Sequence, residues 1–421
     1  MHVQLGPPAF RSAPRLAVVA SVTAALALTL PAVPSAGGAL TAALAPSEVP
    51  SAAPAQVGSW QAVALPGATC GGPDRAPYEY FLSPAPGEAA GILFVLSGGG
   101  ACLKEGPAPQ GASGTAAQLY CMNYGNFRDP FFTRVTFAGD LAPAAVIPVF
   151  RRADPANPFR AHHFVAVPYC TGDVHAGAMT VPHDYDPQPE STFEVLHRGH
   201  LNVAAVAADV RERFPDDLPV VLTGFSAGGF GSIYNFPLFV SLWPRTAVVS
   251  DAGNAPDAPG SLLQREAARV AERWGARELL PAYCREDRCL SDTLHLLAAH
   301  ARAHDGRDGR PWRPFGLLQG QQDGTLVDYL EVSACGYQLA LSRGLAAALA
   351  ADNLRAFVPA TDRHVFGAVN PLESPFRSLG GVDPIAWAGA LATATSAAEL
   401  PPSALDPWLP CNPVRLALTA R

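Results

Sequence analysis

The residue best suited to chemistry in this 421-residue chain is a serine between two glycines. Residues 224–228 read Gly-Phe-Ser-Ala-Gly and follow an apolar run at 219–222. Where a strand turns sharply into a helix at such a serine, the turn lifts the hydroxyl clear of the sheet, and the glycines leave room for it. The N-terminus of the helix then favours negative charge that develops beside the serine. We therefore expect Ser226 to be a nucleophile, the alternative being an ordinary glycine-rich turn.

A serine nucleophile needs a base and an acid, which follow it in the order acid, then histidine, in hydrolases built this way. The apolar run 315–318 precedes a polar loop with Asp323, and the run 354–359 precedes His364. The loops after such strands lie at the edge of an open sheet that carries the chemistry. We expect His364 to accept the serine proton and Asp323 to orient the imidazole. The alternatives are a surface histidine and a turn aspartate, and the rival acid, Asp328, is expected to face solvent.

Backbone donors for an oxyanion are expected after an earlier apolar run, at 91–96. Residues 97–102 read Ser-Gly-Gly-Gly-Ala-Cys. Lipases and esterases have a glycine-rich turn here, whose N–H acts together with the N–H that follows the nucleophile. Gly99 or Gly100, and Ala227, would be these donors. A phosphate-binding loop is disfavoured, because the segment lacks both a Gly-Lys-Ser/Thr ending and a Gly-x-Gly-x-x-Gly helix opening.

The pattern of apolar runs predicts the elements that carry these residues. Further expected elements are strands at 163–167 and 246–250, and a helix at about 192–214. Strands that alternate with helices predict a mostly parallel sheet with helices on both faces.

Two inserts interrupt this alternation, at about residues 103–160 and 255–311. The second has helical patterns at 262–274 and 292–304. Such inserts form a lid or pocket wall in some proteins and peripheral decoration in others. The first insert contains candidates either for an acyl pocket or for core packing, namely Phe127, Phe131 and Phe132.

Five sequence blocks occur in a recognisable order. They are Gly-Gly-Gly-Ala-Cys at 98–102, Pro-Tyr-Cys-Thr-Gly-Asp-Val-His-Ala-Gly at 168–177, Arg-Gly at 198–199, Gly-Phe-Ser-Ala-Gly-Gly at 224–229 and Ser-Asp-Ala-Gly at 250–253. In this order the blocks resemble the pectin acetylesterase family, over roughly residues 70–411. The resemblance implies an α/β-hydrolase-like fold with lid-like inserts, and carboxylic ester hydrolysis without a metal or cofactor. It also implies that Ser226, Asp323 and His364 form a triad.

The chain departs from the family pattern beside the glycine run, where Ser97 replaces an acid and Ala101 an aromatic residue. The family covers both sugar acetyl esters and a lipid acyl ester, so the fold does not fix the substrate. We expect a short-chain, acetyl-type ester of a polysaccharide or small molecule. The alternatives are a lipid-type deacylase or polyester hydrolase, and a catalytically silent exported binding protein. Candidate supports of the site are Ser191, Arg198, His175 and Asp251.

The N-terminus resembles an export signal. Arg11 and Arg15 precede an apolar run to about residue 30, and small residues follow it. We expect a signal peptide at 1–36, an Ala/Pro/Ser-rich linker at 37–58 and one catalytic domain at 59–421. The protein would be secreted or periplasmic. A membrane anchor is the alternative, although the apolar run is short for a span.

The charge of the chain excludes some partners. The formal net charge is −7, and removal of the two signal-peptide arginines would take it to −9. Because no basic cluster with interleaved aromatic residues occurs, we expect no nucleic acid partner. A strongly acidic polymer would meet unfavourable long-range charge. We expect a monomer without a membrane span once the signal is removed.

Eight cysteines in an exported chain indicate disulfides, although the sequence leaves their connectivity open. Cys284 and Cys289 are close enough in sequence to close a small loop. The family resemblance implies the pairs Cys70–Cys170 and Cys102–Cys121, which would leave Cys335 to pair with Cys411.

Metal sites are disfavoured. The spacing of Cys284 and Cys289 lacks the second pair that a zinc site needs. His300 and His304 are one helical turn apart without the glutamate of a metalloprotease helix, and we expect them on an exposed helix face.

Overall fold

This computed structural model describes residues 60–72, 74–103, 122–123, 126–130, 147–181, 183–185, 193–367 and 376–411. The expected signal peptide (1–36) and linker (37–58) lie outside these residues. So do several residues that the sequence singles out, namely Cys121, Phe131, Phe132 and Ser191.

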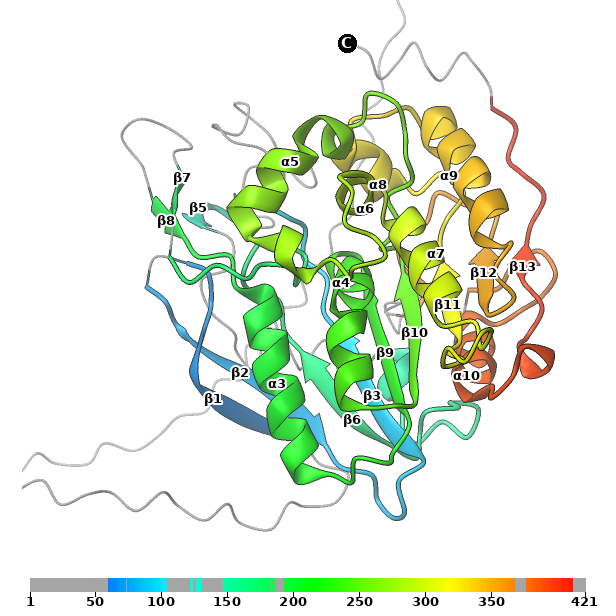
Figure 1. Cartoon of the computed structure of the whole chain (residues 1–421), viewed down its shortest axis with the longest axis horizontal. Coiled ribbons are helices and arrows are strands. Elements are labelled where there is room, and N and C mark those ends of the chain that lie inside the picture. Colours follow the sequence, from blue (N-terminus) through cyan, green and yellow to red (C-terminus); the bar gives the residue numbers. More distant parts are fainter. Residues whose placement is uncertain are drawn as a thin grey trace, which may run out of the picture. The chain divides into compact units, whose positions relative to one another are not determined.

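A nine-stranded sheet forms the centre of the described chain, in the order β1-β2-β6-β3-β9-β10-β11-β12-β13 (Figure 1). Its strands are β1 (Gln61–Thr69), β2 (Pro77–Ser83), β3 (Gly91–Leu96), β6 (His162–Val167), β9 (Val220–Phe225), β10 (Thr246–Asp251), β11 (Phe315–Leu318), β12 (Leu354–Val358) and β13 (Ala404–Leu405). Within this sheet β2 alone runs antiparallel to its neighbours, β1 and β6, and the remaining pairs of strands are parallel. The expected mostly parallel sheet is therefore confirmed. Two small hairpins join β4 (Met122–Asn123) to β5 (Asn126–Pro130), and β7 (His183–Tyr185) to β8 (Phe193–Val195).

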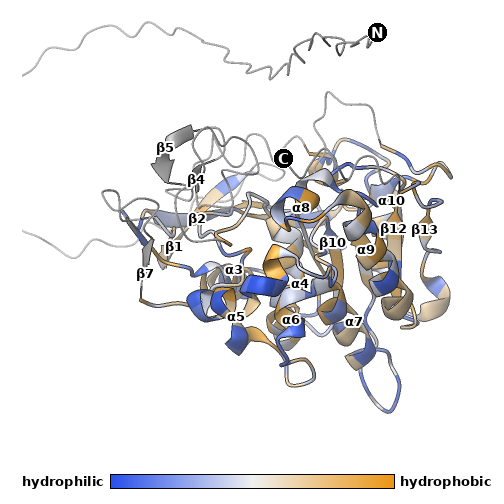
Figure 2. Ribbon diagram, turned by 90° about the horizontal axis from the view of Figure 1, so that it is seen from above, coloured by the Kyte–Doolittle hydropathy of each residue, from blue (hydrophilic) through white to orange (hydrophobic). Residues whose placement is uncertain are grey.

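Helices cover both faces of the sheet. They are α3 (Gly199–Arg213), α4 (Ala227–Leu242), α5 (Leu262–Trp274), α6 (Arg288–Ser291), α7 (Thr293–Ala303), α8 (Gly324–Tyr329), α9 (Ala334–Ala348) and α10 (Pro384–Thr393), with short 3₁₀ turns η2 (Pro148–Phe150), η3 (Ala276–Leu279) and η4 (Ala397–Glu399). The ring of Phe315 packs on Phe236 of α4, whereas the next residue, Gly316, faces Leu391 of α10. Successive strand residues point to opposite faces, so α4 and α10 lie on opposite sides of β11. In Figure 2, α10 likewise lies across β12 from α9.

The sequence places the start of α3 too early. The helix was expected from about residue 192, but residues 193–195 form β8 and α3 begins at Gly199. The N–H of Gly199 donates to the buried carboxylate of Asp173 at 2.7 Å. Because the residue that caps the helix is 26 positions away in sequence, no local signal marks this end.

The second insert is helical as expected, because its helix ends carry local signals. Ser261 accepts the N–H of Gln264 at the start of α5, and Gly275 ends that helix with a left-handed φ of 65°. The side chain of Asp292 caps α7 in the same way, by accepting the N–H of His295. All three helices of this insert, α5, α6 and α7, lie between β10 and β11 in the chain.

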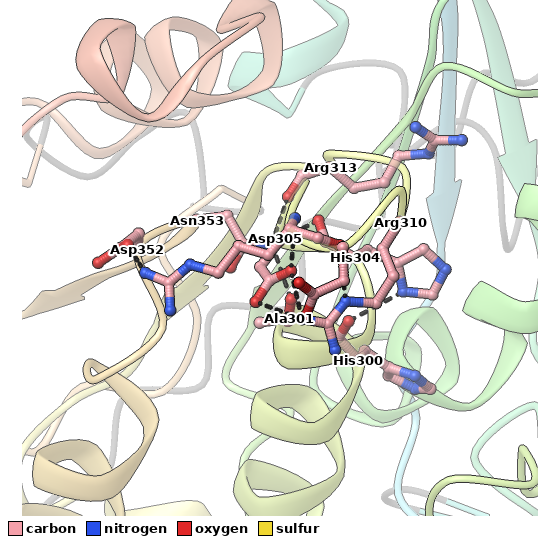
Figure 3. Close-up of polar contacts among 10 residues, drawn as sticks. His300, Ala301, His304, Asp305, Arg310, Arg313, Asp352 and Asn353 are labelled. Atoms are coloured by element: carbon pink, nitrogen blue, oxygen red, sulfur yellow. Dashed lines mark hydrogen bonds and ion pairs between the residues drawn. The ribbon is translucent and has the colours of Figure 1, made fainter.

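The expectation that His300 and His304 lie on an exposed helix face is wrong for His300, which is completely buried. Its Nε2–H donates to the carbonyl of Ile233 at 3.0 Å, and the Tyr283 hydroxyl donates to Nδ1 at 2.7 Å. Burial lowers the pKa of His300 to about 3. His304 donates from Nδ1 to the His300 carbonyl (Figure 3), and its ring packs on that of Phe236. Both ring nitrogens of His300 are used, so this pair is a packing feature and not a metal site.

The structure contains the disulfides Cys70–Cys170 and Cys284–Cys289. Cys102 is also disulfide-bonded, although its expected partner lies outside the described residues.

The expected fourth pair is not formed, because Cys335 and Cys411 are free thiols. The two thiols are nevertheless neighbours, because partial desolvation and a hydrogen bond with Cys335 raise the pKa of the exposed Cys411 to about 11. The ligand atoms of Cys284, Cys289 and His295 lie within 4.8 Å of one another, but the disulfide occupies both sulfurs. This cluster is therefore not a zinc site in the oxidised protein.

No helix in the described part of the chain is both long and apolar enough to cross a membrane.

Asn353 provides a test of how the segment after α7 is held (Figure 3). Its buried amide donates to the carbonyls of Ala301, His304 and Arg313 at 2.8–2.9 Å. Asn353→Ala removes all three of these buried hydrogen bonds and should lower the free energy of unfolding by about 3 kcal/mol. The matched control is Asp352→Ala, which removes an exposed ion pair with Arg307 and should cost less than about 1 kcal/mol. Urea denaturation of both variants measures the difference, and equal losses would contradict this account.

Candidate active site

Ser226 lies at a sharp turn between β9 and α4, which we call the nucleophile elbow (residues 224–228). Its backbone has φ 56° and ψ −123°, and its N–H donates to the carbonyl of Asp251 at 2.9 Å. A Cβ on Gly228 would lie 1.9 Å from the Leu96 oxygen, and one on Gly224 would lie 2.3 Å from the Gly228 oxygen. Both positions need glycine because the backbones touch. The expected strand–turn–helix geometry is present, with a left-handed serine at its apex.

Asp323 and His364 contact each other directly. The Nδ1 of His364 lies 2.8 and 2.9 Å from the two carboxylate oxygens of Asp323. Asp323 is fully buried and also accepts the amide of Gln319 at 2.8 Å and the N–H of Leu326 at 3.0 Å. The carboxylate therefore orients the imidazole with the proton on Nδ1, which leaves Nε2 as the basic nitrogen. The rival acid, Asp328, is exposed on α8, as expected.

The structure does not join Ser226 to His364 by a hydrogen bond. The Nε2 of His364 is buried and has no hydrogen-bond partner among the described residues. Catalytic hydrogen bonds of this kind are often long in the absence of substrate. The three residues nevertheless follow β9, β11 and β12, which lie near one another in the parallel part of the sheet. The three loops consequently meet at one edge of the sheet.

The glycine-rich loop lies against the nucleophile elbow. A Cβ on Gly98 would lie 2.9 Å from the Ser226 Cβ, and Gly99 and Gly100 have φ values of 156° and 83°. Gly100, Ser226 and Ala227 line the same cavity. Backbone N–H groups of this loop and of Ala227 can therefore serve the same oxyanion.

His175 supports the start of this loop. Its Nε2–H donates to the carbonyl of Ser97 at 2.9 Å, and burial lowers its pKa to about 4, so the ring is neutral. The buried carboxylate of Asp173 accepts the hydroxyl of Thr171 at 2.7 Å and the N–H of His175 at 3.2 Å. This arrangement fits the expected supporting role of His175. Arg198, in contrast, donates to Thr69 on β1.

A small apolar cavity of about 50 Å³ opens beside Ser226. Its described lining comes from the glycine-rich loop, α4, α5 and α8, with a few neighbouring residues, and includes Leu103, Phe230, Leu263, Val270, Ala271, Trp274, Leu326 and Tyr329. Such a volume admits only a few water-sized groups. The cavity is therefore small, apolar and adjacent to Ser226.

Gln319 is a supporting residue that motifs in the sequence do not identify. It is fully buried at the end of β11, and its amide holds one oxygen of Asp323. The signal available in the sequence is its position directly after the apolar run, four residues before the acid.

The chain is similar to known proteins in part of its sequence and in its fold. A pectinacetylesterase family model matches residues 149–287, a segment that includes Ser226. Among curated protein sequences none matches this chain. Of the solved structures that match, the Wnt deacylase Notum from Drosophila has a TM-score of 0.54 and 16% identity, over 84% of this chain and 98% of that chain. At this identity the likeness concerns the fold, which is α/β-hydrolase-like. Over residues 149–287 the chain thus resembles the pectin acetylesterase family, and this resemblance indicates a carboxylic ester hydrolase.

Proposed function

We propose that this protein is a serine esterase that removes short acyl groups through Ser226, His364 and Asp323. The observation that carries the proposal is the meeting of three features at one sheet edge. These features are the left-handed serine elbow, the Asp323–His364 pair and an apolar cavity that Ser226 itself lines.

In this mechanism the Ser226 hydroxyl attacks the ester carbonyl while Nε2 of His364 takes its proton. Asp323 stabilises the resulting imidazolium through Nδ1. The N–H groups of Gly99 or Gly100 and of Ala227 donate to the oxyanion. His364 then protonates the leaving alcohol, which gives an acyl-enzyme. Water, activated by the same histidine, releases the acid and restores Ser226.

The cavity supports an acetyl-type ester over a long acyl chain. Its apolar lining favours a hydrocarbon group, and its volume of about 50 Å³ limits the length of that group. A lipid-type deacylase or polyester hydrolase is the second candidate, because the wall is almost entirely apolar. A long chain would need α5 to move away from the nucleophile elbow.

A silent binding protein has less support. Left-handed backbone at a non-glycine residue is retained at sites where the surrounding structure holds it, and such sites are commonly functional. We also propose export, with a signal peptide at 1–36 and a linker at 37–58, because disulfides persist in oxidising compartments.

Hydrolysis of p-nitrophenyl acetate, butyrate, octanoate and palmitate tests the proposal. The protein that begins after the signal peptide should prefer acetate or butyrate, and Ser226→Ala should lower kcat by at least about 10³-fold, because the nucleophile is lost. Labelling by a fluorophosphonate should likewise require Ser226. A best rate on octanoate or palmitate would favour the lipid-type candidate. Absence of turnover and labelling in the folded protein would favour the binding protein.

A substitution on α5 tests the role of the cavity. Ala271 is buried and lines it, so Ala271→Leu should lower kcat/KM for butyrate about tenfold and change acetate hydrolysis little, because the added side chain fills space that the longer acyl group needs. Ala268→Leu adds the same side chain on the exposed side of α5 and is the matched control. Parallel changes in both variants would disprove the assignment of this cavity to the acyl group.

A further inference from the structure

One residue at the end of β10 contacts both halves of the proposed catalytic site. The backbone oxygen of Asp251 accepts the N–H of Ser226 at 2.9 Å. Its carboxylate accepts the N–H of Phe366 at 2.8 and 3.0 Å and that of Gly367 at 2.6 Å. These donors follow His364 by two and three residues. Asp251 therefore links the nucleophile elbow to the histidine loop, residues 359–367.

Left-handed backbone is concentrated around this residue. Ser226, Ala252 and Val365 have φ values of 56°, 53° and 59°. A β-branched residue such as valine rarely adopts this conformation, and it persists only where neighbouring contacts hold it. The two N–H groups bound by the Asp251 carboxylate come directly after Val365. The contact that offsets this strain is thus made by Asp251.

The backbone around Asp251 is itself fixed. The N–H of Ala252 donates to the Leu318 oxygen at the end of β11, the strand that leads to Asp323. A Cβ on Gly253 would lie 2.1 Å from the carbonyl carbon of Gly229, so this part of the chain packs directly on α4. The Ser-Asp-Ala-Gly block at 250–253 is accordingly a rigid base for the carboxylate.

We propose that Asp251 is a positioning residue whose ionised carboxylate holds the turn after His364, and so keeps the imidazole in reach of Ser226. The inference rests on the catalytic roles proposed above. Asp251 acts through the histidine loop and does not line the acyl cavity. Its loss should therefore affect the chemical step more than substrate binding.

The carboxylate also gives the site a pH dependence. Burial raises the pKa of Asp251 to about 6, against the hydrogen bonds from Gly367 and Phe366, which lower it. The nearby charge of His364 lowers this pKa, and that of Asp323 raises it. A proton on the carboxyl turns one acceptor into a donor that faces a backbone N–H. The turn loosens, and turnover should fall as the pH drops through about 6.

This loss of activity does not require unfolding. Because the pKa is raised in the folded state, the folded protein binds this proton more readily than the unfolded chain. The contribution of Asp251 to stability is full below its unfolded pKa and is lost as the pH rises through the folded pKa. Protonation of this group should therefore inactivate the enzyme reversibly. Burial also raises the pKa of Asp173 to about 6, so both carboxyl groups titrate in the same pH range. The pH profile of the wild type cannot separate them, and a variant of Asp251 is needed.

The experiment compares Asp251→Asn with Asp362→Asn. Asp362 is an exposed residue of the histidine loop, so both changes remove one negative charge near His364. Only the first also replaces one of the two oxygens that accept the N–H groups of Phe366 and Gly367 with an NH2 donor. For p-nitrophenyl acetate, Asp251→Asn should lower kcat about 100-fold, since a small displacement of the base is costly. KM should stay within roughly threefold, because the acyl cavity is unchanged. In Asp251→Asn the acid limb of the pH profile of kcat/KM should depend on one protonation fewer than in the wild type. In Asp362→Asn this limb should keep its wild-type shape.

The outcomes separate the inference from the proposed function. A wild-type protein without turnover or fluorophosphonate labelling would overturn both. An active wild type with an Asp251→Asn variant of equal kcat and equal acid limb would overturn the positioning role alone. If Asp251→Asn fails to fold in a thermal melt, the comparison moves to a Val365→Gly background, where glycine adopts the left-handed turn without strain. A loss of kcat relative to Val365→Gly alone is still expected there, because the carboxylate also holds the N–H groups of Phe366 and Gly367, and equal rates would overturn the proposal.

Discussion

The backbones of β3, β9, β10 and the first turn of α4 meet so closely that no side chain fits between them. Gly228 touches the Leu96 carbonyl and Gly229 lies against Gly253. These contacts leave the elbow little freedom to relax, so the left-handed serine is held by neighbours that cannot withdraw. They also bring the glycine-rich loop beside the nucleophile. The geometry of the whole site therefore depends on contacts between main chains, and side chains add to a frame that already exists.

Buried carboxylates connect the loops that this frame supports. Asp173 binds the start of α3 and the loop that carries His175, and Asp323 binds the start of α8 as well as His364. Asp251 binds the turn after the histidine. Burial removes the water that hydrates each carboxylate, and this desolvation is unfavourable by itself. Several hydrogen-bond donors of the protein replace the lost water. Loops rich in polar backbone are thus held at fixed positions without a large apolar core of their own.

Structural features that depend on neighbouring residues in the chain can be predicted from the sequence. The ends of α5 follow from Ser261 and Gly275, and the strand-end positions of Asp323 and His364 follow from apolar runs. Contacts between distant segments escape this reasoning. The start of α3 depends on Asp173, the burial of His300 depends on Ile233 and Tyr283, and the size of the cavity depends on how α5 and α8 pack over the elbow. The roles of the triad residues stay a prediction, since Ser226 and His364 are not yet hydrogen-bonded.

The helix α5 contributes a wall of the cavity and no catalytic group. It begins and ends with its own capping residues, between two strands of the sheet. The elbow, in contrast, tolerates almost no change because its glycines have no space for a side chain. Substitutions that alter which ester is accepted can therefore accumulate on this one amphipathic segment while the reaction is preserved. During evolutionary divergence, such a protein would keep nearly the same reaction while its substrate specificity changes.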